Sequence, residues 1–157
     1  MGAAAPVRRA AAVAVAALAA CATGPEPIVV GVDSCAYCRM TIVEPQFAAE
    51  LVSPTGRVYK FDSIECLAGY YTRASDGGDP GDIYVADFLA PDRLLPLSEA
   101  AFRHTAEVHT PMAAGIIAFA NDEAAIAPAG EDLTWREVVE RVRASHIEAP
   151  ASLPLTP

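Results

Sequence analysis

A short hairpin that runs directly into a capped helix is the feature of this sequence that most restricts its fold. Side-chain character alternates along residues 47–52 and 57–61, and Ser53-Pro54-Thr55-Gly56 between them has turn chemistry. Asp62-Ser63-Ile64-Glu65 follows at once, with an Asp cap and a Glu three residues on. This arrangement predicts a helix that continues to about Arg73. Its main apolar stripe is expected at Ile64, Leu67, Ala68 and Tyr71. The first half of the chain is therefore expected to be a ββα unit.

The second half has the same order of elements, although the two halves share no recognisable sequence repeat. A loop rich in glycine and aspartate at 75–82 separates them. Thr134-Trp135-Arg136-Glu137 is a capping box that starts a second helix. The apolar face of that helix consists of Trp135, Val138, Val139 and Val142. The predicted strands are Ile83 to Phe88, Ala101 to His109, and Gly115 to Phe119. The predicted fold class is α+β with mostly antiparallel strands.

The N-terminus has the pattern of a bacterial lipoprotein signal. Arg8 and Arg9 precede a run of Ala, Val and Leu from 10 to 20, about half of what a membrane-spanning helix needs. The run ends at Leu18-Ala19-Ala20-Cys21, which resembles a lipobox. In such precursors the signal is cut before the cysteine, which then carries diacylglycerol. The alternative is an ordinary secretory signal with an incidental cysteine. We expect residues 1–20 to be removed and lipid on Cys21 to hold the protein on a membrane.

The remaining chain divides into a tether, a domain and a tail. Residues 21–32 contain two prolines and no periodicity, and are predicted to be an acylated tether. The folded domain is expected at 33–147, with lobes at about 33–75 and 82–147, before a disordered tail at 148–157. Without Arg8 and Arg9 the chain carries 9 basic and 20 acidic residues, a net charge of about −11, which argues against nucleic acid. We expect it on the cell membrane or outer membrane, facing the periplasm or the exterior.

Cys35-Ala36-Tyr37-Cys38-Arg39-Met40 carries the clearest chemical signal. Its two cysteines place two thiolates on one tight turn, a spacing that suits a shared metal. Met40 adds a thioether two residues later. Copper(I) is a soft ion that prefers thiolate and thioether sulfur, whereas zinc takes thiolate, imidazole and carboxylate. The methionine therefore favours copper(I) over zinc.

Three further residues are candidates for the same site. Cys66 lies in the first turns of the predicted helix, where free backbone N–H groups favour a thiolate, although a buried core cysteine is the alternative. His109 and Met112 flank Pro111 on a turn before the predicted strand at Gly115; a surface histidine and a core methionine are the alternatives. If Cys21 is acylated, three cysteines remain. One thiol then stays unpaired in an oxidising compartment unless a metal or a partner occupies it.

These residues resemble the NosL family, the nitrous oxide reductase accessory lipoproteins. Besides the lipobox cysteine, the similar stretches are Asp33 to Ile42, Phe47 to Leu51, Tyr59 to Leu67, and Pro111 to Phe119. The resemblance implies two small ββα-type lobes, similar to a fold seen in the organomercurial lyase MerB. It also implies a membrane-anchored copper(I) metallochaperone that supplies nitrous oxide reductase, working with the NosD, NosF and NosY transport machinery. It assigns metal-site roles to Cys35, Cys38, Met40 and Met112. A glycine is expected after that methionine, where this chain has Ala113.

Two other functions fit part of the pattern. A structural zinc site built from Cys35, Cys38, Cys66 and a histidine is a proper zinc set, but it leaves Met40 unexplained. A thiol-disulfide oxidoreductase normally has its first cysteine at a helix N-terminus after a strand, whereas this pair precedes the first predicted strand. A single disulfide explains neither Met40 nor the odd thiol. The sequence contains no nucleophile elbow and no glycine-rich phosphate loop, so we expect no catalysis.

Overall fold

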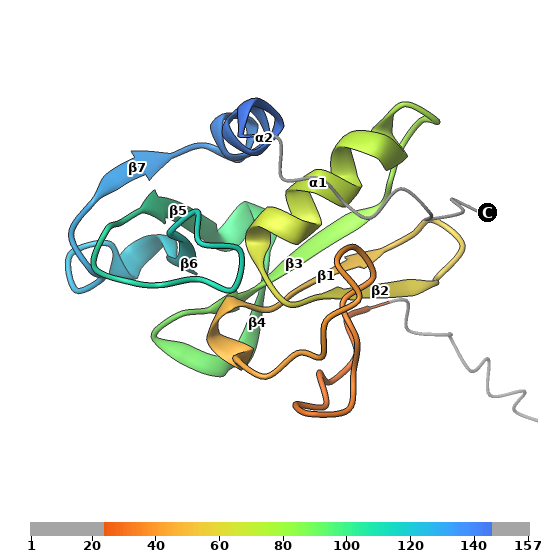
Figure 1. The fold of residues 1–157 in the computed structure, drawn as a ribbon, viewed down its shortest axis with the longest axis horizontal. Helices are drawn as coiled ribbons and strands as arrows, with labels where there is room; N and C mark the ends of the chain where they lie inside the picture. The colour runs from red at the N-terminus through yellow and green to blue at the C-terminus, as the bar shows by residue number, and fades with distance from the viewer. Residues whose placement is uncertain (1–23, 146–157) are drawn as a thin grey trace, which may run out of the picture.

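The computed structural model describes residues 24–145, in which two helices lie across two antiparallel sheets (Figure 1). The predicted signal at 1–20, the lipidation site Cys21 and the predicted tail at 148–157 lie outside the described residues. The helices are α1 (Ile64–Ser75) and α2 (Trp135–Ala144). The strands are β1 (Ala49–Val52), β2 (Val58–Phe61), β3 (Asp82–Asp87), β4 (Ala90–Pro96), β5 (Ala100–His104), β6 (Ile116–Ala120) and β7 (Glu131–Leu133).

Both sheets are antiparallel, as the sequence predicts. The first has the strand order β2-β1-β3-β4, and the second has the order β6-β5-β7. The predicted hairpin is present, with Ala49 of β1 opposite Phe61 of β2. The Phe88 N–H donates to the Ala118 carbonyl at 2.8 Å and so connects the end of β3 to the second sheet. The α+β fold class is thus confirmed.

The first sheet contains strands from both of the lobes that the sequence suggests. Residues 82–96 were expected in the second lobe, yet β3 pairs with β1 in the first sheet, with Ala49 opposite Val85. All four residues of β1 are buried, so its backbone needs a hydrogen-bonding strand on both sides. The sequence does not predict β4, because Pro91, Pro96 and two adjacent charges obscure any alternation. Proline is tolerated there because β4 lies at the edge of the sheet.

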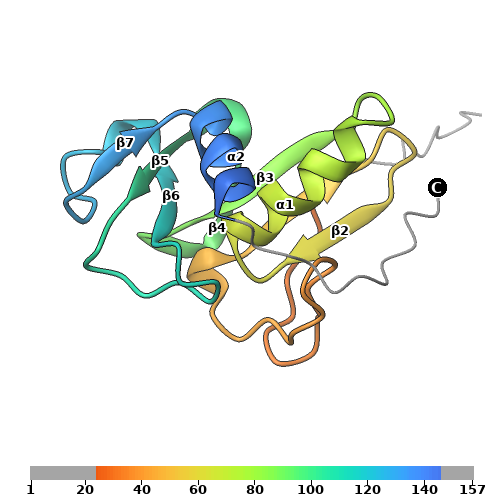
Figure 2. The same ribbon diagram turned by 45° about the horizontal axis from the view of Figure 1, so that its top comes forward.

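The two helices pack side by side and cover the core (Figure 2). The predicted stripe of α1 is buried at Ile64, Leu67 and Ala68, and that of α2 at Val138 and Val142. Aromatic contacts link the helices to each other and to the second sheet: the Trp135 ring lies 5.4 Å from that of Tyr71 and 5.6 Å from that of Phe102. Neither helix has the length and apolarity needed to cross a membrane.

The start of α2 confirms the capping box. The Thr134 hydroxyl accepts a hydrogen bond from the Glu137 N–H at 3.3 Å, and the Glu137 carboxylate accepts one from the Thr134 N–H at 2.7 Å. These two bonds satisfy N–H groups that would otherwise have no partner at the helix start. A local sequence signature was therefore sufficient to place α2.

One predicted strand is shorter than expected. The strand at 101–109 ends at His104, because the Thr105 hydroxyl accepts from the Glu107 N–H at 3.1 Å and begins a turn. Residues 40–43 form no strand and make one isolated bridge, between Ser34 and Thr41. Both regions are irregular loops close to the predicted metal-site residues.

Residues 24–32, predicted as part of the tether, are held against the folded domain. The Glu26 N–H donates to Glu50 at 2.9 Å, and the Lys60 ammonium donates to the Pro27 carbonyl at 2.8 Å. Ile28 packs against a small buried cluster that contains Ile42. The sequence does not predict the two hydrogen bonds, because they join the segment to strands that follow it by more than twenty residues.

Candidate metal centre

The segment from Cys35 to Met40 closes into a tight loop beside α1. The Cys35 N–H donates to the Met40 carbonyl at 2.8 Å, and the Arg39 N–H donates to the Cys35 carbonyl at 3.1 Å. Arg39 has a φ of 69°, in the left-handed region that lets the chain reverse. The Cys38 N–H points at the Cys35 sulfur, 3.5 Å away. The backbone therefore holds the two thiols together on one side of the loop.

Tyr37, between the two cysteines, anchors this loop to α1. Its side chain is buried, and its ring lies so close to Gly69 that a Cβ there would be 2.6 Å from Tyr37 Cζ. The Arg73 guanidinium lies over the same ring at 5.3 Å. The Ala36 N–H also donates to the Lys60 carbonyl of β2 at 2.7 Å. The loop is thus fixed between α1 and the first sheet.

The first turn of α1 brings a third thiol and a carboxylate to the loop. The predicted Asp62 cap is wrong: Ser63 caps the helix, and its hydroxyl accepts from the Cys66 N–H at 3.2 Å. Asp62 instead accepts a hydrogen bond from the Cys38 thiol at 3.2 Å. Either residue type can cap a helix, so the sequence does not show which one does. The extended Ser63 leaves Asp62 free to turn toward the cysteine loop.

Cys35, Cys38, Asp62 and Cys66 form one cluster. One ligand atom from each, three sulfurs and a carboxylate oxygen, lie within 4.8 Å of one another. Within residues 24–145 this is the one such group of three or more His, Cys, Asp or Glu side chains. Cys35, Asp62 and Cys66 are buried, whereas Cys38 is partly exposed. None of the three cysteines is in a disulfide.

The electrostatics of the cluster favour a bound cation. Hydrogen bonds from Cys38 and Cys66 hold the pKa of the Cys35 thiol well below its usual range. The resulting thiolate in turn raises the pKa of the Cys38 and Cys66 thiols, through hydrogen bonding and repulsion. Burial, then the Cys35 charge, raises the pKa of Asp62 to about 6. The Cys35 thiolate thus opposes ionisation of the other three acidic groups, and a metal ion relieves that repulsion.

The donor atoms suit a soft or borderline metal. Three thiols can supply the two or three thiolates that copper(I) prefers. One Asp62 oxygen, Oδ1, is buried and has no hydrogen-bond partner among the described residues. An unpartnered buried carboxylate oxygen is costly unless a cation is close to it. Because Asp62 is a hard ligand, the same four residues also form an acceptable zinc set.

The other predicted ligands lie outside this cluster of four. Met40 is the last residue of the loop, and its side chain is 56% exposed. Met112 is partly buried and packs against the main core, which also contains Cys35 and Cys66. His109 is exposed and lines a small hollow of about 200 Å³ together with His104 and Gly115. The described contacts therefore bring Cys35, Cys38 and Cys66 together. The ligand roles of Met40, Met112 and His109 stay predictions.

Glu65 ties the loop that carries Met112 to the start of α1. Its carboxylate is fully buried and accepts from the Thr110 hydroxyl at 2.7 Å and from the Ile116 N–H at 3.4 Å. The predicted capping role of Glu65 is therefore wrong, because its side chain points to the second half of the chain. The sequence did not reveal that Asp62 contacts the thiols or that Glu65 binds the Met112 loop. The single available signal was their place beside Cys66.

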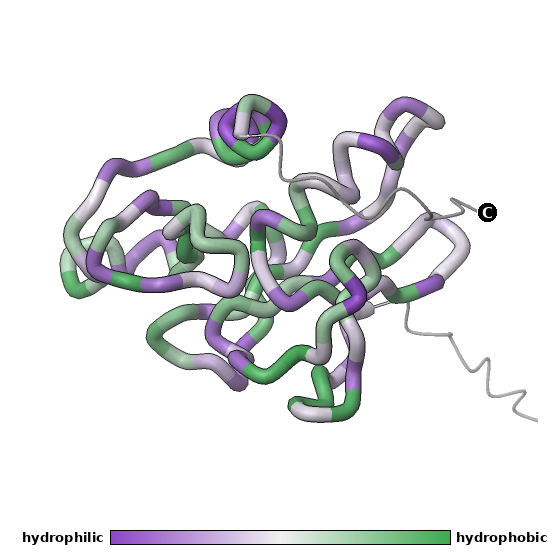
Figure 3. Tube along the Cα trace, in the orientation of Figure 1, coloured by the Kyte–Doolittle hydropathy of each residue, from purple (hydrophilic) through white to green (hydrophobic). Residues whose placement is uncertain are grey.

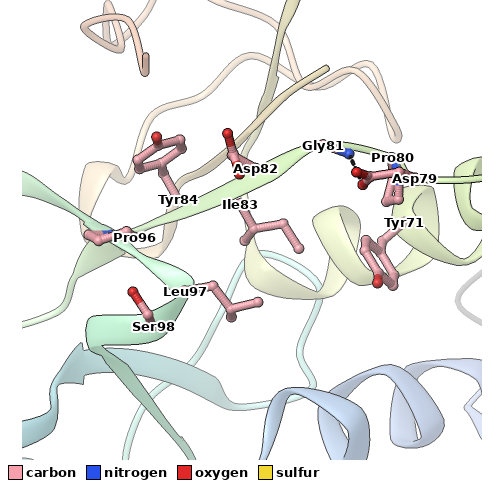
Figure 4. A pocket seen from close by; sticks show the side chains of 10 residues that line it. All are labelled: Tyr71, Asp79, Pro80, Gly81, Asp82, Ile83, Tyr84, Pro96, Leu97 and Ser98. Atoms are coloured by element: carbon pink, nitrogen blue, oxygen red, sulfur yellow. Dashed lines mark hydrogen bonds between the residues drawn. The ribbon is translucent and has the colours of Figure 1, made fainter. Parts of the chain in front are cut away.

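A cavity among the described residues lies apart from the thiols (Figure 4). It has a volume of about 450 Å³ and lies between α1, the start of β3 and the end of β4. Asp79 accepts from the Gly81 N–H at 2.9 Å on its border. Its lining contains no cysteine, histidine or methionine, so it offers no soft ligand.

The fold and the cluster define a small α+β protein with a candidate metal centre of three cysteines and an aspartate. The family model for NosL matches residues 29–132, more than half of the chain, and the chain belongs to the NosL family. The structure is also similar to the crystal structure of the copper chaperone NosL from Shewanella denitrificans. The TM-score is 0.60 and the identity is 18%, over 73% of this chain and 95% of that one. At this identity the likeness shows the fold. None of the curated sequences compared with the chain matches it.

Proposed function

We propose that this protein is a membrane-anchored copper(I) carrier that supplies an exported copper enzyme, which we infer to be nitrous oxide reductase. The observation that carries the proposal is the cluster of three unbridged thiols within 4.8 Å of one another and of Asp62. Membership of the NosL family supports the copper assignment and the association with the nitrous oxide reductase system. The similar protein from Shewanella denitrificans is a copper chaperone, which is consistent with this function.

In this proposal the ion enters and leaves at Cys38. Cys35 and Cys66 are buried, whereas Cys38 is partly exposed and its thiol donates to Asp62. An incoming ligand from another protein can therefore reach the metal on the Cys38 side. Copper(I) then passes from one set of sulfur ligands to another without a change in oxidation state, and each released thiolate takes up a proton. The carrier needs no catalytic group for this exchange.

Met40, Met112 and His109 are proposed as additional ligands of the same ion. Met40 is the last residue of the cysteine loop, and the Glu65 contacts hold the Met112 segment to the helix of Cys66. The lipid on Cys21 is proposed to keep the carrier on the membrane, close to the NosD, NosF and NosY machinery. Restricted diffusion there raises its effective concentration near a membrane partner.

A structural zinc centre is the second candidate function, because Asp62 adds a hard ligand to the three thiols. An anaerobic titration of the purified protein with copper(I) and zinc(II), each in competition with a chelator, separates the two. The proposal predicts tight one-to-one copper(I) binding, weakened by Met40→Leu while zinc binding is unchanged. Tight zinc binding with weak copper(I) binding would overturn it. Unchanged copper(I) affinity in Met40→Leu would remove Met40 from the ligand set.

A further inference from the structure

Exposed aliphatic side chains gather on the segment that carries the cysteine loop. Within residues 24–145 seven large hydrophobic residues are exposed, and five of them fall between positions 29 and 43. We call these five the apolar rim: Val29, Val30, Val32, Met40 and Val43, with exposed fractions from 46% to 73%. Figure 3 shows hydrophobic stretches in this segment, at the bottom of the view. Turns at a protein surface are normally polar, so the rim calls for an explanation.

Hydrogen bonds make the rim and the cysteine loop one unit. The Gly31 N–H donates to the Ile42 carbonyl at 2.8 Å, and the Ile42 N–H donates to the Asp33 carbonyl at 2.9 Å. Beyond Ser34 and Thr41, the Cys35 N–H donates to the Met40 carbonyl. Residues 29–43 thus form an irregular hairpin with the cysteines at its turn and the valines near its base. Val32 precedes Cys35 by three residues, which span at most about 10 Å even in an extended chain, so one partner can contact both the rim and the cysteine loop.

The charges around the rim favour a protein partner over a lipid surface. Glu26, with its side chain 62% exposed, and Glu44 flank the rim, and Asp33 is paired with Lys60. Segments that insert into a membrane interface usually carry Trp, Tyr, Lys and Arg. Between positions 29 and 43 the one aromatic residue, Tyr37, is buried, and the one basic residue, Arg39, is exposed and outnumbered by the three acidic residues in and beside this segment. An acidic border is complementary to a protein surface with basic residues around an apolar centre.

The size of the rim suits a short-lived contact. Five half-exposed aliphatic side chains offer a few hundred Å² of apolar surface, which is too little for a permanent dimer and typical of transient complexes. Resting on the function proposed above, we propose that the apolar rim is the docking surface for the protein that exchanges copper(I) with the cluster. That partner has an apolar patch with basic residues around it, beside its own metal ligands. Docking on the rim brings those ligands to Cys38.

The test compares Val32→Asp with Ile126→Asp in the full-length lipoprotein. Val32 is 73% exposed in the rim, and Ile126 is 71% exposed outside it, so the two changes are matched in exposure and charge. Both are expected to retain the wild-type copper(I) affinity when purified. In denitrifying cells that lack their own carrier, Val32→Asp is expected to lower the copper content of nitrous oxide reductase about tenfold. Ile126→Asp is expected to leave it unchanged.

Each alternative has a distinct outcome. Weak copper(I) binding by the wild type contradicts the proposed function itself. Tight binding with equal copper delivery by the two variants overturns the docking surface alone. A Cys21→Ser protein that binds phosphatidylcholine vesicles, and loses this binding with Val32→Asp, would assign the rim to lipid and overturn the proposal. A wild-type dimer that Val32→Asp dissociates in sedimentation experiments would assign it to a second copy and overturn it as well.

Discussion

Asp62 is the residue on which the choice of metal depends. It is buried, it accepts from the Cys38 thiol, and its Oδ1 has no partner among the described residues. A carboxylate is a good zinc ligand and a poor copper(I) ligand, whereas thiolates serve both ions. Its presence among three cysteines therefore allows either ion to bind and makes Asp62 a sensitive probe of which ion the cluster selects.

Asp62→Asn is expected to affect the two metals unequally. The amide keeps the size of the side chain and removes its negative charge, so zinc affinity should fall by about tenfold or more. Copper(I) affinity should change less than zinc affinity, because the thiolates remain. Competition with chelators measures both. Asp132→Asn, an exposed aspartate outside the cluster, is the control. A larger loss for copper(I) than for zinc would contradict the ligand assignment.

Ala113 occupies the position where the family resemblance leads one to expect glycine, and its φ is 58°. A left-handed alanine costs about 1 kcal/mol relative to glycine, although glycine loses more freedom on folding. Ala113→Gly is therefore expected to raise the free energy of unfolding by about 0.5 kcal/mol. Ala124→Gly, at a φ of −54°, should lower it. Urea unfolding measures both, and destabilisation by Ala113→Gly would show that the loop adopts another conformation.

At the scale of elements, the contact between α1 and the cysteine loop determines the geometry of the site. The Tyr37 ring occupies the space that a side chain at position 69 would need. Alanine is a better helix former than glycine by about 1 kcal/mol, so a substitution that added only helix propensity would stabilise α1. Because the ring lies so close, alanine at position 69 is instead expected to destabilise the protein.

Gly69→Ala is expected to displace the Tyr37 ring, lower the free energy of unfolding and weaken copper(I) binding. In a Tyr37→Leu background the ring is absent, and the same change should be neutral or stabilising. A double-mutant cycle on unfolding free energies and copper(I) affinities measures this coupling. Additive effects of the two substitutions would mean that the ring and the helix do not constrain each other.

The elements that the sequence predicts correctly depend on local patterns. The hairpin at β1 and β2, the apolar stripe of α1 and the capping box at Thr134 are all readable within about ten residues. The candidacy of Cys66 for the same site followed from its place in the first turns of the predicted helix. The roles of Asp62 and Glu65, and the pairing of β3 with β1, depend on contacts between distant segments. No local pattern specifies such contacts.

At the scale of the whole molecule, Glu50 links stability to pH. It is fully buried in β1, where its Oε2 accepts from the Glu26 N–H and its Oε1 has no partner among the described residues. Burial raises its pKa from 4.5 to about 7, with Lys60 lowering it and Glu26 and Asp33 raising it. The folded state therefore binds the proton more tightly than the unfolded state does. This contribution to stability is full below pH 4.5 and is lost as the pH rises through 7.

Glu50→Gln removes that titration. The variant should match the wild type near pH 4 and exceed its free energy of unfolding by about 1–3 kcal/mol at pH 8. Urea unfolding across this range measures the difference. Glu140→Gln, whose side chain is 65% exposed, should show no such pH dependence. A stability difference that does not grow with pH would mean that Glu50 is ionised in the folded protein throughout.

The central claim is that Cys35, Cys38 and Cys66 together hold copper(I). X-ray absorption spectroscopy of the anaerobically copper(I)-loaded protein tests it most directly, because it identifies the atoms bonded to the metal. We expect a coordination shell of sulfur, with one sulfur fewer in Cys66→Ser and loss of the shell when Cys35 and Cys38 are both replaced by serine. A shell that contains no sulfur, or a spectrum that these substitutions leave unchanged, would contradict the claim.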